Sequence, residues 1–158
     1  VGSYNDLIQR LKKKNLFDIL KYYINEKKIF YLGICVGMQI LSDYGYENTK
    51  TSGLSLIDGI VKKIPVENEV LPNIGWHKII LTKKNSNLFK NLSDNEMLFY
   101  FVHSYFFDLK NINNCSSNIF YEQMISASVE KEHIFGVQFH PEKSQAGGLK
   151  LLQNFCNL

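Results

Sequence analysis

The sequence predicts an α/β protein with an open, mostly parallel central sheet that is flanked by helices. Residues 29–34 form a continuous apolar run, which is typical of a strand buried on both faces of a sheet. Amphipathic helical spacing precedes this run over residues 5–14 and 16–27, and it follows the run over residues 36–44. The order helix, strand, helix indicates an α/β unit built around a parallel strand.

The rest of the chain predicts shorter strands and one more helix. Residues 119–129 and 134–139 predict two strands, with residues 130–132 as the turn between them. An apolar stripe over residues 147–158 predicts a final helix. No repeat or linker interrupts the chain, so we expect residues 1–158 to form one domain. Further β-prone segments lie at residues 60–64, 77–81 and 98–102.

Composition argues against several classes of protein. Lysine and arginine number 18 against 15 aspartates and glutamates, and so small and scattered an excess does not favour nucleic-acid binding. No apolar run approaches the length that spans a membrane. Cys35, Cys115 and Cys156 are odd in number and widely spaced, so they predict neither a disulfide framework nor a metal site. We expect a cytoplasmic protein with reduced thiols, no metal and no cofactor.

One cysteine occupies a pattern that favours catalysis. Cys35 and its neighbour Val36 lie between Gly33 and Gly37, where the predicted strand turns into a helix. This is the nucleophile-elbow pattern with cysteine in place of serine. The turn strains the central residue, the glycines make room, and the helix N-terminus favours the thiolate. The Val36 N–H is placed to stabilise an oxyanion. The alternative is a buried structural cysteine between two chance glycines.

A nucleophilic cysteine needs a base, and His140 is the candidate among four histidines. It follows a predicted strand, as Cys35 does, and active sites gather at the carboxyl ends of strands in open α/β sheets. Glu142 lies two residues further on, across Pro141, where its carboxylate can orient the imidazole. His133 lies in a polar turn and is interpreted as solvent-exposed.

Two motifs resemble those of class I glutamine amidotransferases, whose fold is flavodoxin-like. Residues 33–39, GICVGMQ, resemble the nucleophile motif, and residues 136–142, GVQFHPE, resemble the His/Glu motif. The continuation Lys143-Ser144-Gln145 is similar to that of the glutaminase subunits of imidazole glycerol phosphate synthase. Residues 53–57, 72–76 and 101–105 also fit those subunits. The resemblance covers essentially the whole chain.

The resemblance implies a role for each matching residue. Cys35, His140 and Glu142 would hydrolyse glutamine to glutamate and ammonia. Residues of the oxyanion and substrate pocket would be Gly2, Val36, Gln39, Ser104 and Tyr105. His103 would either support this pocket or be purely structural.

The resemblance also implies a partner. The ammonia would pass to a (β/α)8-barrel cyclase subunit in a heterodimer that makes imidazole glycerol phosphate in histidine biosynthesis. Trp76 and His77 would lie at that interface, and the alternative for Trp76 is an ordinary core tryptophan.

Two features depart from the family pattern. Relatives carry a β-α-β piece of on the order of 30 residues or more before the segment that begins here at Val1, so the sequence resembles an N-terminally truncated domain. His77 stands where relatives usually have asparagine. This difference leaves open a paralogue that supplies ammonia for the amidation of surface sugars. A catalytically inactive interaction subunit is the other alternative.

Overall fold

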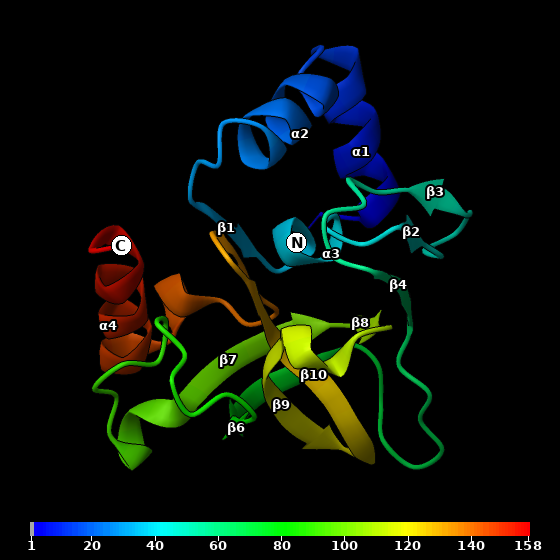
Figure 1. Cartoon of the computed structure of the whole chain (residues 1–158). Coiled ribbons are helices and arrows are strands. Elements are labelled where there is room, and N and C mark those ends of the chain that lie inside the picture. The colour runs from blue at the N-terminus through cyan, green and yellow to red at the C-terminus, as the bar shows by residue number, and fades with distance from the viewer. Residues whose placement is uncertain (1) are drawn as a thin grey trace.

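Two parallel strands bring the predicted site residues together in the computed structural model of the chain, which describes residues 2–158 (Figure 1). Strand β1 (Tyr31–Ile34) pairs with β11 (Ile134–Val137), with Ile34 opposite Val137. The sheet continues antiparallel through β10 (Gln123–Lys131), β9 (Cys115–Tyr121) and β6 (Ile80–Leu81), in the order β1-β11-β10-β9-β6. The α/β class is confirmed, and the sheet is mixed rather than mostly parallel.

Two smaller sheets complete the β-structure of the described residues. One has the order β3-β2-β4-β8, and it joins β4 (Gly59–Lys63) to β8 (Tyr105–Leu109) in antiparallel fashion. Its other strands are β2 (Tyr44–Gly45) and β3 (Thr51–Ser52). The other sheet pairs β5 (Asn73–Lys78) with β7 (Leu98–His103). Strands β7 and β8 are separated by a single residue, Ser104, so the two small sheets follow each other closely in the chain.

The predicted helices are confirmed, with one shorter than expected. They are α1 (Tyr4–Lys13), α2 (Phe17–Asn25), α3 (Val36–Gln39) and α4 (Gln145–Cys156). Helix α3 was expected to reach residue 44. It ends at Gln39 because the carbonyls of Ile40 and Leu41 accept hydrogen bonds from the backbone of residues 54–57 instead of from a further helical turn. Three short 3-10 helices are η1 (Asp94–Met97), η2 (Ile112–Asn114) and η3 (Pro141–Lys143).

The expected strand over residues 119–129 is wrong, because a hairpin interrupts it at Glu122. That residue has a φ of 55°, and Tyr121 pairs with Gln123 across the turn. Strand β10 then runs through Lys131, so the expected turn at 130–132 begins only at Glu132. Glutamate is not a typical turn residue at positive φ, so no local signal predicts the first hairpin.

The sheet is covered by apolar side chains on both faces. Ile134 on β11 packs with residues of α1, α2 and α3, whereas Phe135 and Val137 pack with Leu151 of α4. Figure 1 shows α4 at the side of the molecule away from α1 and α2. Burial on both faces explains the continuous apolar runs in the sequence. No helix among residues 2–158 is both long enough and apolar enough to cross a membrane.

Tyr4 anchors the start of α1 beside the site. Its side chain is fully buried, and its hydroxyl forms a 2.9 Å hydrogen bond with Ser42 Oγ. Its backbone N–H donates to Glu47 Oε2 over 2.7 Å. A Cβ atom on Gly53 would lie 2.3 Å from the Tyr4 hydroxyl, so the chain passes the ring too closely for a side chain there. These contacts hold the start of α1 against residues 42–53, which follow α3 in the chain.

Candidate active site

Cys35 occupies the strained turn that the sequence predicts. It joins β1 to α3 with φ 52° and ψ −112°, which is an unfavourable region for a residue with a side chain. Its backbone N–H donates to the Val137 carbonyl over 2.8 Å, which continues the pairing of β1 with β11. The side chain is almost fully buried at 6% exposure. The elbow geometry expected for a nucleophile is therefore confirmed.

The two glycines that flank Cys35 are not equivalent. A Cβ atom on Gly33 would lie 2.3 Å from the Gly37 carbonyl oxygen and 2.6 Å from the Met38 nitrogen. A Cβ atom on Gly37 would meet nothing closer than the Tyr31 hydroxyl at 3.7 Å, which is ordinary contact. The expectation that both glycines relieve a clash therefore holds for Gly33 only.

The environment of the Cys35 sulfur favours the thiol, contrary to the expectation from the helix terminus. Burial raises the pKa of the Cys35 thiol, and the Glu142 carboxylate acts in the same direction. The Val36 N–H and the Gln138 side chain oppose this increase without cancelling it. Helix α3 has only four residues, so its dipole is small. A thiol in this environment must lose its proton before it can act as a nucleophile.

His140 has an unoccupied ring nitrogen. Its Nδ1 lies 2.7 Å from Glu142 Oε1, and because a carboxylate only accepts, Nδ1 carries the hydrogen. The lone pair is then on Nε2, which is buried and has no hydrogen-bond partner among residues 2–158. A buried imidazole nitrogen without a partner is costly unless a substrate or a reacting proton occupies it. This tautomer is the one that a general base requires.

The fold places Cys35 and His140 at the same edge of the sheet. Cys35 directly follows β1, and His140 follows β11, which pairs with β1 in parallel. The His140 backbone N–H donates to the Tyr100 carbonyl over 2.9 Å, which fixes the segment after β11. No hydrogen bond joins Cys35 Sγ to His140 among the described contacts, so Nε2 is free to accept the proton.

The residues expected to bind substrate lie at different distances from this elbow along a chain of contacts. A Cβ atom on Gly2 would lie 3.8 Å from Val36 Cγ1, so Gly2 lies against the residue that follows Cys35. Gln39 is buried at the end of α3, and its Nε2 donates to the Tyr105 carbonyl over 3.0 Å. The neighbouring Ser104 carbonyl accepts from the Ile64 N–H over 2.9 Å. The structure therefore places Gly2 beside the elbow and joins Gln39 to Tyr105, while the contact found for Ser104 is with Ile64.

The two expected interface residues lie on opposite faces of β5. Trp76 is 41% exposed and contacts the Tyr100 ring edge-on at 5.8 Å between centroids, which excludes the alternative of a core tryptophan. His77 points to the other face, where it packs edge-on against Phe101 and Tyr121. Its Nε2 lies 2.7 Å from Asn73 Oδ1. His77 is therefore half-buried within the fold and does not share the exposed face of Trp76.

Two residues have roles that the sequence analysis missed or misjudged. Gln138, which lies inside the second motif, is fully buried, and its Nε2 donates to Cys35 Sγ over 3.6 Å. The interpretation of His133 as solvent-exposed is wrong. Its side chain is only 10% exposed, and its Nε2 donates to the Ile24 carbonyl over 2.7 Å, which ties the turn before β11 to α2. A turn in the sequence does not reveal that a helix packs over it.

The burial of His103 leads us to expect that the stability of the folded protein depends on pH. The pKa of His103 is lowered to about 4, mainly by burial; a hydrogen bond to the Tyr105 carbonyl opposes this effect, and His77 and His140 contribute to the lowering. The unfolded chain therefore binds a proton between pH 6.5 and 4 that the folded chain does not. We expect acidification from pH 7 to 4.5 to lower the free energy of unfolding by about 2 to 3 kcal/mol through this residue.

Urea unfolding at the two pH values, carried out on the wild type and on His103→Asn, measures this contribution. The variant should lose that part of the acid sensitivity, while the carboxylates common to both proteins cancel in the comparison. An equal loss of stability in the two proteins would contradict the assignment of the acid sensitivity to His103.

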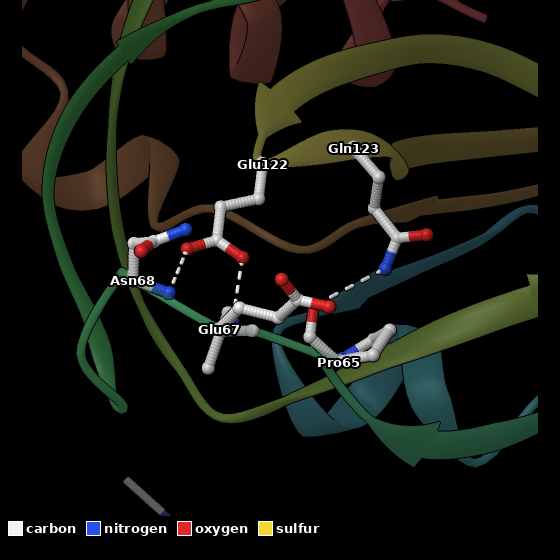
Figure 2. A pocket seen from close by; sticks show the side chains of 6 residues that line it. Pro65, Glu67, Asn68, Glu122 and Gln123 are labelled. Atoms are coloured by element: carbon white, nitrogen blue, oxygen red, sulfur yellow. Dashed lines mark hydrogen bonds between the residues drawn. The ribbon is translucent and has the colours of Figure 1, made fainter.

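A surface cavity of about 540 Å³ is lined by residues 65–68, Glu122 and Gln123, none of which is a predicted site residue (Figure 2). Here Glu122 accepts hydrogen bonds from the backbone N–H groups of Glu67 and Asn68 over 2.7 and 2.6 Å, and these bonds, led by that from Glu67, lower the pKa of Glu122. Because the carboxylate is already satisfied, we interpret this feature as a loop anchor. Among residues 2–158, no three metal-binding side chains gather at one point.

Comparison with known proteins agrees with this geometry. Residues 9–157 match the family model described as Glutamine amidotransferase class-I. The chain is 44% identical over 160 residues to imidazole glycerol phosphate synthase subunit HisH of Pelagibacter ubique, covering 99% of this chain and 76% of the relative. It is 40% identical over 162 residues to the subunit of the same name from Leptospira borgpetersenii, covering 100% of this chain and 78% of the relative.

Solved structures support the fold. A crystal structure of a glutamine amidotransferase matches with a TM-score of 0.68 at 12% identity, over 98% of this chain and 76% of that one. A glutamine amidotransferase from Thermotoga maritima matches with a TM-score of 0.61 at 20% identity, over 99% of this chain and 59% of that one. Family model, relatives and site geometry agree, and the chain belongs to the class I glutamine amidotransferases.

Proposed function

We propose that this chain is the glutaminase subunit of an imidazole glycerol phosphate synthase, and that it hydrolyses glutamine to glutamate and ammonia. One observation carries the proposal. A buried cysteine in a strained elbow and a histidine with a free buried nitrogen follow two paired parallel strands. The identity of 44% to a subunit of that synthase supports the choice within the family.

The chemistry follows from the positions of the hydrogen atoms. His140 Nε2 takes the proton from Cys35 Sγ, and the thiolate attacks the carboxamide carbon of glutamine. Glu142 stabilises the imidazolium through the hydrogen bond at Nδ1. The Val36 N–H, with the backbone near Gly2 beside it, stabilises the oxyanion. His140 then returns the proton to the departing nitrogen, which leaves as ammonia.

A second half-reaction restores the cysteine. The first half leaves a γ-glutamyl thioester on Cys35, and His140 Nε2 is again unprotonated once ammonia has formed. It can therefore accept a proton from a water molecule that attacks the thioester carbon. Collapse of this intermediate breaks the C–S bond and releases glutamate, and the proton held by His140 returns to the sulfur. Gln39, Ser104 and Tyr105 would hold the glutamine in both half-reactions.

The ammonia would pass to a (β/α)8-barrel cyclase subunit bound as a heterodimer. That subunit would use it to form imidazole glycerol phosphate and aminoimidazole carboxamide ribotide in histidine biosynthesis. The proposed contact is the exposed face of β5, where Trp76 and Ile74 are 41% and 59% exposed. Large exposed apolar side chains on one strand face are typical of protein interfaces.

Labelling with an electrophilic glutamine analogue tests the glutaminase proposal. We expect the analogue to modify Cys35 and to leave Cys115 and Cys156 unmodified, as read by peptide mass spectrometry with the cyclase subunit present. Cys156 is exposed and Cys115 is buried, so together they control for access and for nonspecific thiol reactivity. An excess of glutamine should protect Cys35. The absence of an adduct on Cys35 would favour the inactive interaction subunit.

The identity of the substrate that receives the ammonia is tested in a separate experiment. With glutamine and the nucleotide substrate of the cyclase, the complex should form imidazole glycerol phosphate. His77 stands where relatives usually have asparagine. This difference leaves amidation of a surface sugar as the alternative use of the ammonia. Glutamine hydrolysis without binding to the cyclase or formation of its product would favour that paralogue.

A further inference from the structure

A row of buried amides connects the Cys35 sulfur to a backbone carbonyl. Gln138 Nε2 lies 3.6 Å from Cys35 Sγ, and Gln138 Oε1 accepts a hydrogen bond from Gln39 Nε2 over 2.9 Å. Gln39 Nε2 also donates to the Tyr105 carbonyl over 3.0 Å. The two glutamine side chains are 0% and 5% exposed. Two buried amides therefore lie between the sulfur and β8.

The direction of every bond in this row follows from the Tyr105 carbonyl. A carbonyl oxygen can only accept, so Gln39 must turn its NH₂ group toward it. The second hydrogen of that NH₂ group then goes to Gln138 Oε1, and this contact leaves the NH₂ group of Gln138 facing Cys35. Reversing either amide would bring two oxygen atoms or two N–H groups together in a buried place. The sulfur is therefore presented with a donor.

The Tyr105 carbonyl is itself held by a second row of buried groups. His103 Nδ1 donates to it over 2.8 Å, so His103 Nε2 is an acceptor, and the Asn73 amide donates to that nitrogen over 3.2 Å. Asn73 Oδ1 accepts in turn from His77 Nε2 over 2.7 Å. Asn73 and His103 are 1% and 5% exposed. Residues of β5 and β7 therefore hold in place the carbonyl that orients the two amides.

We infer that Gln138 is a further residue of the glutaminase reaction: its NH₂ group, aimed by Gln39 and Tyr105, donates to Cys35 Sγ and stabilises the thiolate while His140 holds the proton. This inference rests on the proposed function of Cys35. A donor matters at this sulfur because the surrounding burial otherwise favours the thiol. The same N–H would stabilise the sulfur again when the thioester collapses.

Alkylation of Cys35 by iodoacetamide as a function of pH tests the inference, because only the thiolate reacts. Gln138→Leu removes the donor at similar volume, and we expect it to raise the pH midpoint of alkylation by about one unit. Gln138→Glu places a carboxylate oxygen beside the sulfur and should raise the midpoint further. Peptide mass spectrometry separates Cys35 from Cys115 and Cys156.

Gln123→Leu is the matched control. It removes the same amide group from a solvent-exposed hydrogen bond to the Pro65 carbonyl, and the midpoint should stay at the wild-type value. The titratable groups near the row are His77, His103, His140, Glu142 and Tyr31, and they are unchanged in all variants, so their effects cancel in the comparison. A wild-type midpoint in folded Gln138→Leu would overturn the inference.

Gln39→Leu keeps the test decisive if Gln138→Leu does not fold. This variant leaves the Gln138 amide in place but frees it to turn, so we expect a smaller upward shift of the midpoint. No shift in this variant, together with none in Gln138→Glu, would overturn the inference. Alkylation does not require glutamine hydrolysis, so failure here is distinct from failure of the glutamine-analogue labelling.

Discussion

Replacing Cys35 with alanine is expected to lower the rate of glutamate formation from glutamine by about 10⁴- to 10⁶-fold, as loss of the nucleophile does in other triad hydrolases. The side chain is small and 6% exposed, and alanine carries the same backbone strain at φ 52° as cysteine does. The fold should therefore survive the change. The measurement is release of glutamate by the complex with the cyclase subunit, compared with the wild type at equal concentration.

Two controls separate chemistry from folding. Cys156→Ala removes an exposed thiol near the end of α4 and should leave the rate unchanged. The cyclase bound to the Cys35→Ala protein should still form product when ammonium salt replaces glutamine, since only the supply of ammonia is lost. Glutamate formation at the wild-type rate by Cys35→Ala would remove Cys35 from the mechanism. Loss of the ammonium-dependent reaction would indicate a damaged complex.

The parts of the site that could be predicted from the sequence are those fixed by local geometry. Cys35 and Val36 follow a strand directly, and Glu142 lies two residues from His140, so short stretches of chain determine their relation. The rule that sites gather at strand ends predicts that Cys35 and His140 share one edge of the sheet, and the parallel pairing of Ile34 with Val137 agrees with it.

The parts that could not be predicted depend on contacts between distant segments. The direction of the Gln138 amide depends on the Tyr105 carbonyl, which is brought to Gln39 across 66 residues of sequence. The turn at Glu122 depends on backbone N–H groups more than 50 residues earlier. The burial of His133 depends on the position of α2. None of these contacts leaves a periodic pattern in the sequence.

One added methyl group is expected to have opposite consequences at Gly33 and Gly37, the two glycines of the elbow. In Gly33→Ala, the new Cβ would lie 2.3 to 2.6 Å from the Gly37 carbonyl and the Met38 nitrogen, which are all backbone atoms of α3. No side-chain rotation can relieve this clash, so α3 must move away from β1 and carry Cys35 with it.

We expect Gly33→Ala to lower the free energy of unfolding by about 3 kcal/mol, the upper range for overpacking. The rate of glutamate formation should fall by at least about 100-fold, because a displacement of about 1 Å at a reacting atom has such an effect. Urea unfolding and the glutaminase assay measure the two quantities.

Gly37→Ala is the matched control, since its Cβ would only touch the Tyr31 hydroxyl at 3.7 Å. Alanine is also favoured over glycine within a helix by about 1 kcal/mol, so this variant should be at least as stable as the wild type and should keep its activity. Equal damage in the two variants would mean that the elbow requires glycine for backbone freedom at both positions. Wild-type behaviour of Gly33→Ala would mean that α3 does not lie against β1 as closely as 2.3 Å implies, and the strained position of Cys35 would lose its structural cause.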